Sequence, residues 1–185
     1  MNMAKDLFFA QQTLTTLFST TNKLQMQGDK QLQDITLRQM LAIPALIHAP
    51  DGKATINYLA KEMATTKQSA KQLVDALARK GYLSVAPSEE DKRAVNISVT
   101  AEGLHAFMRC SERTDAFLAN AFASFSSAEL ETLCILLQKL YRFDGHPQET
   151  LNEHSHFNAS DSAAILQHHP VFALLRGQAN KKEPD

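Results

Sequence analysis

The spacing of apolar side chains along the chain predicts a mainly helical protein. Over residues 4–26, apolar residues recur at a period of about 3.6, which places them on one face of a helix. Gly28 and Asp29 are expected to end this helix. A second apolar stretch covers residues 36–48. Because Pro44 removes one backbone hydrogen bond from a helix, we expect a kink or a break near Ile43.

Two short helices are predicted to follow in close succession. Thr55 can cap the first, because a threonine hydroxyl accepts a hydrogen bond from a free amide at a helix N-terminus. The second is expected to begin at Thr66, or one residue earlier, and to end at Gly81. Its buried stripe is predicted to consist of Ala70, Leu73, Val74 and Leu77.

A β-hairpin and two further helices are predicted next. Residues 82–86 and 94–99 alternate between apolar and polar side chains, with residues 87–93 as a long tip between them. Thr100 can then cap a helix that extends to about residue 125. The cap of the helix that follows is expected to be Ser126 or Ser127.

The composition excludes several classes of protein. Lysine and arginine number 19 against 20 aspartate and glutamate, which excludes a histone-like basic protein. No apolar run approaches the roughly 18–20 residues of a membrane-spanning helix, and the N-terminus lacks a signal-peptide pattern. Two cysteines make no disulfide framework, so we expect a cytoplasmic protein. Because no phosphate-binding loop or nucleophile signature is present, we expect no enzyme and assign no cofactor or metal.

The predicted order of elements is that of a winged helix-turn-helix. The outer face of the helix that begins at Thr66 is polar and largely free of acid. Lysine can contact phosphates or guanine, glutamine can pair with adenine, and the amides at the helix N-terminus can bind a phosphate. The major groove of B-DNA, about 12 Å wide, admits one such helix. The candidate DNA-binding residues of this helix are Thr66, Lys67, Gln68, Ser69, Lys71 and Gln72.

Two segments of the chain resemble the MarR (multiple-antibiotic-resistance regulator) family. Residues 59–83 resemble the helix-turn-helix of its DNA-binding lobe. The wing match is more specific: Asp91-Lys92-Arg93 precedes alternating apolar residues, and Thr100-Ala101-Glu102-Gly103 follows them. The resemblance covers residues 30–142, the terminal helices by pattern only.

The resemblance implies a mainly α fold with a small β-hairpin wing and with dimerisation helices at both ends. It further implies a homodimer that binds double-stranded DNA at a near-palindromic operator, usually as a repressor, and that a small aromatic or phenolic ligand releases. By the motif, Lys92 and Arg93 contact DNA, with Arg93 in the minor groove and Asp91 bracing it. The implied parts are an N-terminal dimerisation helix (1–35), a DNA-binding lobe (36–100), C-terminal dimerisation helices (101–145) and a polar, His-rich tail (146–185).

The sequence departs from the family pattern at three places. Residues 84–86 are neutral where arginine is common, and Ala64 precedes the recognition helix where glycine is common. Pro44 interrupts a helix that the family usually keeps whole. Residues 53–93 hold eight lysines and arginines against five acidic residues, a net charge of +3. This bias has the sign that a DNA-binding lobe requires.

Simpler interpretations stand beside these assignments. Lys67 and Lys71 could merely solvate a helix face, and Gln68 could form a capping box with Thr65. The Asp91 and Arg93 side chains could form an ordinary ion pair in a turn. A stripe of phenylalanines is more typical of a core or dimer seam than of a ligand cage: Phe117, Phe122 and Phe125. Residues suggested for a ligand pocket are Leu41, His105 and Phe107.

Three functional hypotheses remain open on the sequence alone. The first is a DNA-binding transcription regulator. The second is a winged helix that binds an acidic protein partner and has no operator. The third is a metal-responsive regulator that uses tail histidines, or a redox sensor that uses Cys110 or Cys134. The histidines concerned are His154, His156, His168 and His169.

Overall fold

The structure, a computed structural model, describes residues 3–49, 54–88 and 94–145. Its order of elements confirms the predicted mainly α fold with a two-stranded wing. The elements are α1 (Met3–Leu32), α2 (Leu37–Ile47), α3 (Ile56–Glu62), α4 (Lys67–Arg79), β1 (Leu83–Pro87), β2 (Val95–Val99), α5 (Ala101–Ala121), α6 (Ser127–Tyr141) and the 3-10 turn η2 (Arg142–Asp144).

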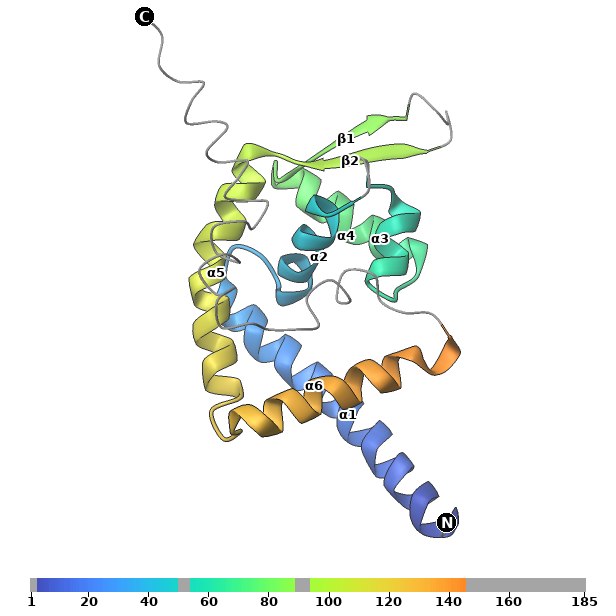
Figure 1. The fold of residues 1–185 in the computed structure, drawn as a ribbon. Coiled ribbons are helices and arrows are strands. Elements are labelled where there is room, and N and C mark those ends of the chain that lie inside the picture. The colour runs from blue at the N-terminus through green and yellow to red at the C-terminus, as the bar shows by residue number, and fades with distance from the viewer. Residues whose placement is uncertain (1–2, 50–53, 89–93, 146–185) are drawn as a thin grey trace, which may run out of the picture.

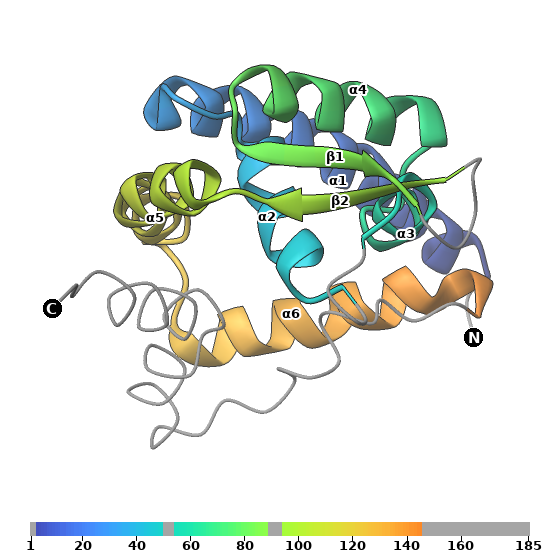
Figure 2. The ribbon, with the colours of Figure 1, turned by 90° about the horizontal axis from the view of Figure 1, so that it is seen from above.

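The winged lobe consists of α2, α3, α4 and the hairpin. Figure 1 shows α2 to α4 beneath the hairpin, with α1, α5 and α6 as long helices at the side and base. Strands β1 and β2 are antiparallel, with Leu83 opposite Val99 and Val85 opposite Ile97. The Ile97 amide also donates to the Ala54 carbonyl at 2.8 Å, which ties the segment before α3 to the wing. Seen from above, β1 lies beside α4 (Figure 2).

Apolar side chains of the three lobe helices, the wing, the end of α1 and the middle of α5 form one core. Burial of a large aliphatic side chain stabilises a fold by about 1.5–3 kcal/mol, so this core holds the lobe together. Its largest fully buried members within the described residues are Leu32, Ile43, Leu59, Leu77, Ile97, Val74 and Cys110.

Hydroxyl caps start the helices where the sequence predicts them. The Thr55 Oγ1 accepts from the Tyr58 amide at 3.1 Å, and the Thr66 Oγ1 accepts from the Ser69 amide at 3.1 Å. Thr100 caps α5, and Ser126 caps α6 in a capping box with Glu129. Each cap satisfies an amide that the helix itself leaves free.

The predicted end of the first helix is wrong. Helix α1 continues through Gly28 and Asp29 to Leu32. Gly28 instead allows close packing, because a Cβ there would lie 2.9 Å from the Leu37 Cδ2 atom. The Asp29 Oδ1 atom accepts from the Leu37 amide at 2.7 Å, so both residues secure the start of α2.

Two further boundaries differ from the prediction. Helix α2 is not broken, because it continues through Pro44 to Ile47, and the Pro44 carbonyl accepts from the His48 amide at 3.0 Å. Buried neighbours on both sides, Ile43 and Ala45, hold the proline in place. Helix α5 ends at Ala121 rather than near residue 125, with Phe122 as its C-cap, whose amide donates to the Leu118 carbonyl at 3.0 Å.

Candidate nucleic-acid interface

Helix α4 has one buried face and one exposed face. The predicted stripe of Ala70, Leu73, Val74 and Leu77 is buried in the lobe core. The opposite face points to solvent, so it is free to contact a ligand. Of the predicted site residues, Thr66, Lys67, Gln68, Lys71 and Gln72 are exposed and Ser69 is half-buried.

The N-terminus of α4 is tightly capped and carries no acidic side chain in its first turn. The Thr66 hydroxyl accepts from the Ser69 amide and donates to the Ser69 Oγ atom at 3.0 Å. The remaining amides of the first turn and the helix dipole give this end a partial positive charge. It is therefore suited to an anionic group such as a DNA phosphate.

The alternative capping box of Thr65 with Gln68 is wrong. Thr66 is the N-cap residue, and the Thr65 Oγ1 atom accepts instead from Arg38 Nη2 at 2.6 Å. Arg38 lies on α2 and holds the turn between α3 and α4. Sequence reasoning missed this residue because the two partners lie 27 positions apart and share no local pattern.

Lys71 forms an ion pair on the exposed face of α4. Its Nζ atom lies 2.6 Å from Asp75 Oδ2, one helical turn later, and the two side chains are 66 % and 53 % exposed. The ammonium is therefore held on the outer face instead of extending freely into solvent.

A groove separates the second half of α4 from strand β1. It has a volume of about 760 Å³. The Arg79 Nε atom folds back to the Asp75 carbonyl at 3.3 Å on this side of the helix. The groove is lined by Gln72, Asp75, Ala78, Arg79 and Val85.

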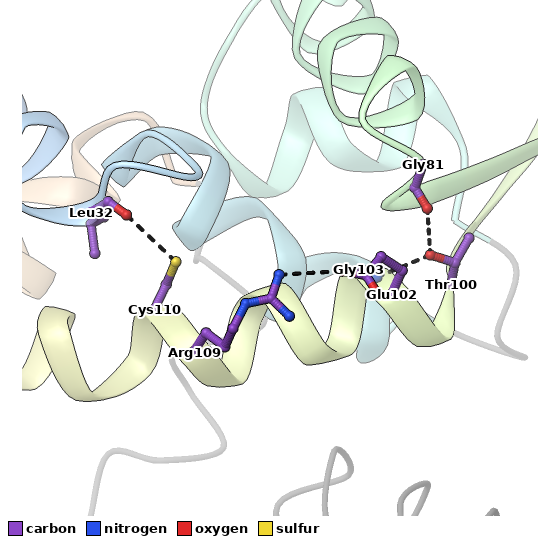
Figure 3. A network of polar contacts seen from close by, with 7 residues as sticks. All are labelled: Leu32, Gly81, Thr100, Glu102, Gly103, Arg109 and Cys110. Carbon is purple, nitrogen blue, oxygen red and sulfur yellow. Dashed lines mark hydrogen bonds and ion pairs between the residues drawn. The ribbon is translucent and has the colours of Figure 1, made fainter.

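Hydrogen bonds at the base of the wing fix the hairpin to α4 and α5 (Figure 3). The Thr100 hydroxyl donates to the Gly81 carbonyl at 2.7 Å and accepts from the Gly103 amide at 3.0 Å. The Thr100 amide donates to the Tyr82 carbonyl at 3.0 Å. The junction orients the wing relative to the recognition helix. Asp91, Lys92 and Arg93, predicted at the wing tip, lie outside the described residues.

Arg109 and Cys110 lie beside this junction on α5. The Arg109 guanidinium contacts the Glu102 carboxylate at 3.2 Å, and this hydrogen bond raises the pKa of Arg109. Burial raises the pKa of the Cys110 thiol, whose Sγ atom lies 3.7 Å from the Leu32 carbonyl. A thiol with a raised pKa reacts poorly, so Cys110 packs the joint between α1 and α5. Cys134 is exposed on α6.

The residues suggested for a ligand pocket do not share one environment. Leu41 is 61 % exposed, His105 is exposed, and Phe107 packs against the core. A separate cavity of about 370 Å³ lies between the end of α1 and the second half of α5. Its lining residues are Gln31, Gln33, Arg113, Ala116, Phe117 and Asn120.

Metal and membrane features are absent from the part of the chain that the structure describes. No three His, Cys, Asp or Glu side chains gather there as a metal site would require. Nor does any helix in that part combine the length and apolarity needed to cross a bilayer. The histidines suggested for metal binding fall in residues 146–185, outside the described ranges.

Comparison with known proteins finds similarity to one family over the winged lobe. The sequence profile described as "MarR family" matches residues 33–94. The HTH-type transcriptional repressor YetL of Bacillus subtilis is 34 % identical over 82 residues, which is 44 % of this chain and 45 % of YetL. The winged lobe is therefore similar to the MarR family. Its alignment spans about half the length of the curated MarR-type relatives that it matches.

Solved structures show the same fold over more of the chain. The S. aureus MepR–DNA complex has a TM-score of 0.61 at 23 % identity and matches 69 % of this chain and 95 % of MepR. The organohalide-sensing regulator RdhR in its 2,4-dichlorophenol-bound form has a TM-score of 0.64 at 16 % identity, over 71 % of this chain and 79 % of RdhR. The MarR fold therefore includes α1, α5 and α6 as well as the winged lobe.

Proposed function

We propose that this protein is a MarR-type, sequence-specific DNA-binding transcription regulator. It acts in the cytoplasm as a homodimer and represses by occupying a near-palindromic operator. The observation that carries the proposal is the exposed, polar face of α4, on which Lys67, Gln68 and Lys71 point away from the core. A helix N-terminus without acid, directly beside a wing, adds a phosphate site at the same end.

In this mechanism α4 enters the major groove and the wing lies along the neighbouring minor groove. Lysine and glutamine on the outer face read base edges, while the amides behind Thr66 hold a phosphate. Arg93 enters the minor groove, where the negative potential favours a cation. Two copies of α4 in a dimer contact successive major grooves about 10 base pairs apart.

Exposed apolar side chains on the terminal helices support the homodimer. Apolar patches this large are rare on soluble monomers and usually mark a contact surface. Sedimentation equilibrium is expected to give twice the 20.5 kDa of one chain, and a monomer at all concentrations would contradict the proposal. The exposed residues on α1 and α6 include Leu7, Phe8, Phe9, Leu14, Phe18, Ile135, Leu136, Leu137 and Leu140.

Selection of bound duplexes from random DNA tests the function. The wild-type protein is expected to enrich a near-palindromic sequence. Lys71→Ala and Arg93→Ala should each weaken binding to it, whereas Lys139→Ala, the same charge change on exposed α6, should not. Enrichment of no sequence would refute the proposal. Unchanged binding by both variants would refute the site assignment.

Release by a small phenolic ligand is the finer part of the proposal. RdhR was crystallised with 2,4-dichlorophenol, and its fold matches this chain. The cavity between α1 and α5 combines the Phe117 ring with the Arg113 guanidinium, which suits an aromatic ligand that carries a negative charge. A panel of phenols added to the protein–duplex complex should include a compound that releases the DNA. The Arg113→Gln variant should require a higher concentration of that compound. If no phenol releases the DNA, the proposal of release by a phenolic ligand fails.

A protein-interaction module is the second candidate function. The observation that favours it is the neutral, exposed stretch Ser84, Val85 and Ala86 on β1, where a DNA-binding wing usually gains from cations. In that case Lys67 and Lys71 would face an acidic partner. Genomic immunoprecipitation distinguishes the two functions, because a module without an operator would enrich no promoter.

A further inference from the structure

Asp75 is the one acidic residue of helix α4. Its exposed carboxylate lines the groove between α4 and β1. A carboxylate near phosphates is repelled, so this position weakens DNA binding in general. The exposed pair with Lys71 contributes little to the stability of the free protein. Stability therefore gives no strong reason for an acid at this position.

We propose that Asp75 is a specificity-determining residue that directs Lys71 toward a base edge and away from the phosphate backbone. The inference rests on the DNA-binding function proposed above. The Asp75 Oδ2 atom takes one of the three hydrogen bonds that the Lys71 ammonium can donate, at 2.6 Å. The other two donors remain available to acceptors on a base edge, such as guanine O6 and N7.

The charge distribution around the groove agrees with this role. Without Asp75, the ammonium of Lys71 could swing to any nearby phosphate, as flexible lysines do in non-specific complexes. Arg79 offers no substitute, because its Nε atom is bonded to the backbone carbonyl of Asp75. The exposed residues of β1 are uncharged, so they add no further attraction to the phosphate backbone of DNA. When the protein is only weakly attracted to DNA phosphates, its affinity for all DNA falls and the base contacts decide which sequence is bound.

Asp75→Asn tests the inference in full-length protein by fluorescence anisotropy. The control is Asp115→Asn, which makes the same charge change on exposed α5. Each protein is titrated with a duplex selected by the wild type and with a scrambled duplex, over a range of salt. Asp75→Asn should bind the scrambled duplex about three- to tenfold more tightly and steepen its salt dependence by about one ion, while affinity for the selected duplex changes less than twofold. The ratio of the two affinities therefore falls, and in Asp115→Asn it stays at the wild-type value.

A double variant separates positioning of Lys71 from simple repulsion. In a Lys71→Gln background, Asp75→Asn should no longer steepen the salt dependence, because the ammonium it would free is gone. An equal steepening in that background would overturn the positioning role. If the wild type discriminates between duplexes and Asp75→Asn discriminates equally well, this inference alone fails. If the wild type does not discriminate, the proposed function fails and this inference fails with it.

Discussion

Replacement of Gly103 by alanine should destabilise the protein, although alanine is the better helix former. Gly103 lies in the first turn of α5, against the peptide between α4 and β1. An added Cβ would overlap the Tyr82 carbonyl oxygen and would lie 2.9 Å from its carbon and 3.0 Å from the Tyr82 Cα atom. These are backbone atoms, so no side-chain rotation relieves the clash.

The magnitude follows from three opposing effects. Overpacking costs about 1–3 kcal/mol. Loss of the bond from the Thr100 amide to the Tyr82 carbonyl costs about 0.5–1.5 kcal/mol more. Alanine in a helix returns about 1 kcal/mol relative to glycine. We therefore expect Gly103→Ala to lower the free energy of unfolding by about 2 kcal/mol, with its sign set by the backbone clash.

Gly28→Ala is the matched control. Gly28 is also a buried helical glycine, but every atom near an added Cβ belongs to the Leu37 side chain: the Cδ2 atom at 2.9 Å can rotate away, and the Cβ atom at 3.1 Å needs a shift of only a few tenths of an ångström. Its gain in helix propensity should nearly offset the repacking, for a net change within about 0.5 kcal/mol of zero. Urea unfolding followed by circular dichroism, at one fixed protein concentration, measures both. Equal stability of the two variants would refute the reasoning.

Three further predictions concern the turn before α4, the buried thiol and the cap of α6. Ala64 has a φ of 45°, so Ala64→Gly should raise the free energy of unfolding by about 0.5 kcal/mol; urea unfolding checks this, and a loss of stability would contradict it. Under native conditions a thiol reagent should label Cys134 and leave Cys110 unlabelled, as measured by peptide mass spectrometry; labelling of Cys110 but not Cys134 would contradict this. Ser126→Ala should cost about 1 kcal/mol. Hydrogen bonds from Ser126 lower the pKa of Glu129, so this carboxylate stabilises the fold above its unfolded pKa, and the contribution is lost as the pH falls through the lowered pKa. In urea unfolding at several pH values, Glu129→Gln should therefore differ from wild type at neutral pH but not in acid.

Features that depend on neighbouring residues could be predicted from the sequence. A hydroxyl cap and the amide that it accepts from lie three positions apart, so Thr55, Thr66, Thr100 and Ser126 mark their helices by local pattern alone. The period of apolar residues likewise predicted the buried and exposed faces of α4. The polar outer face of the candidate site follows directly from that period.

Features that depend on contacts across the fold could not be predicted. The sequence predicts a helix end at Gly28 because glycine favours helix termini, but in the structure Gly28 allows close packing against Leu37. The bond between Arg38 and Thr65 joins two helices and leaves no periodic signal. Asp75 belongs to a groove that exists only once β1 lies beside α4. Tertiary packing, not local propensity, determines all three.

Lysine footprinting in the presence of DNA tests most directly whether the exposed face of α4 contacts the duplex. The full-length protein is acetylated with and without its selected duplex, and the modified lysines are quantified by mass spectrometry. Lys67 and Lys71 should become protected when the duplex is added, whereas Lys23, exposed on α1, should react equally in both samples. Unchanged reactivity of Lys67 and Lys71 in a sample with fully bound DNA would contradict the account.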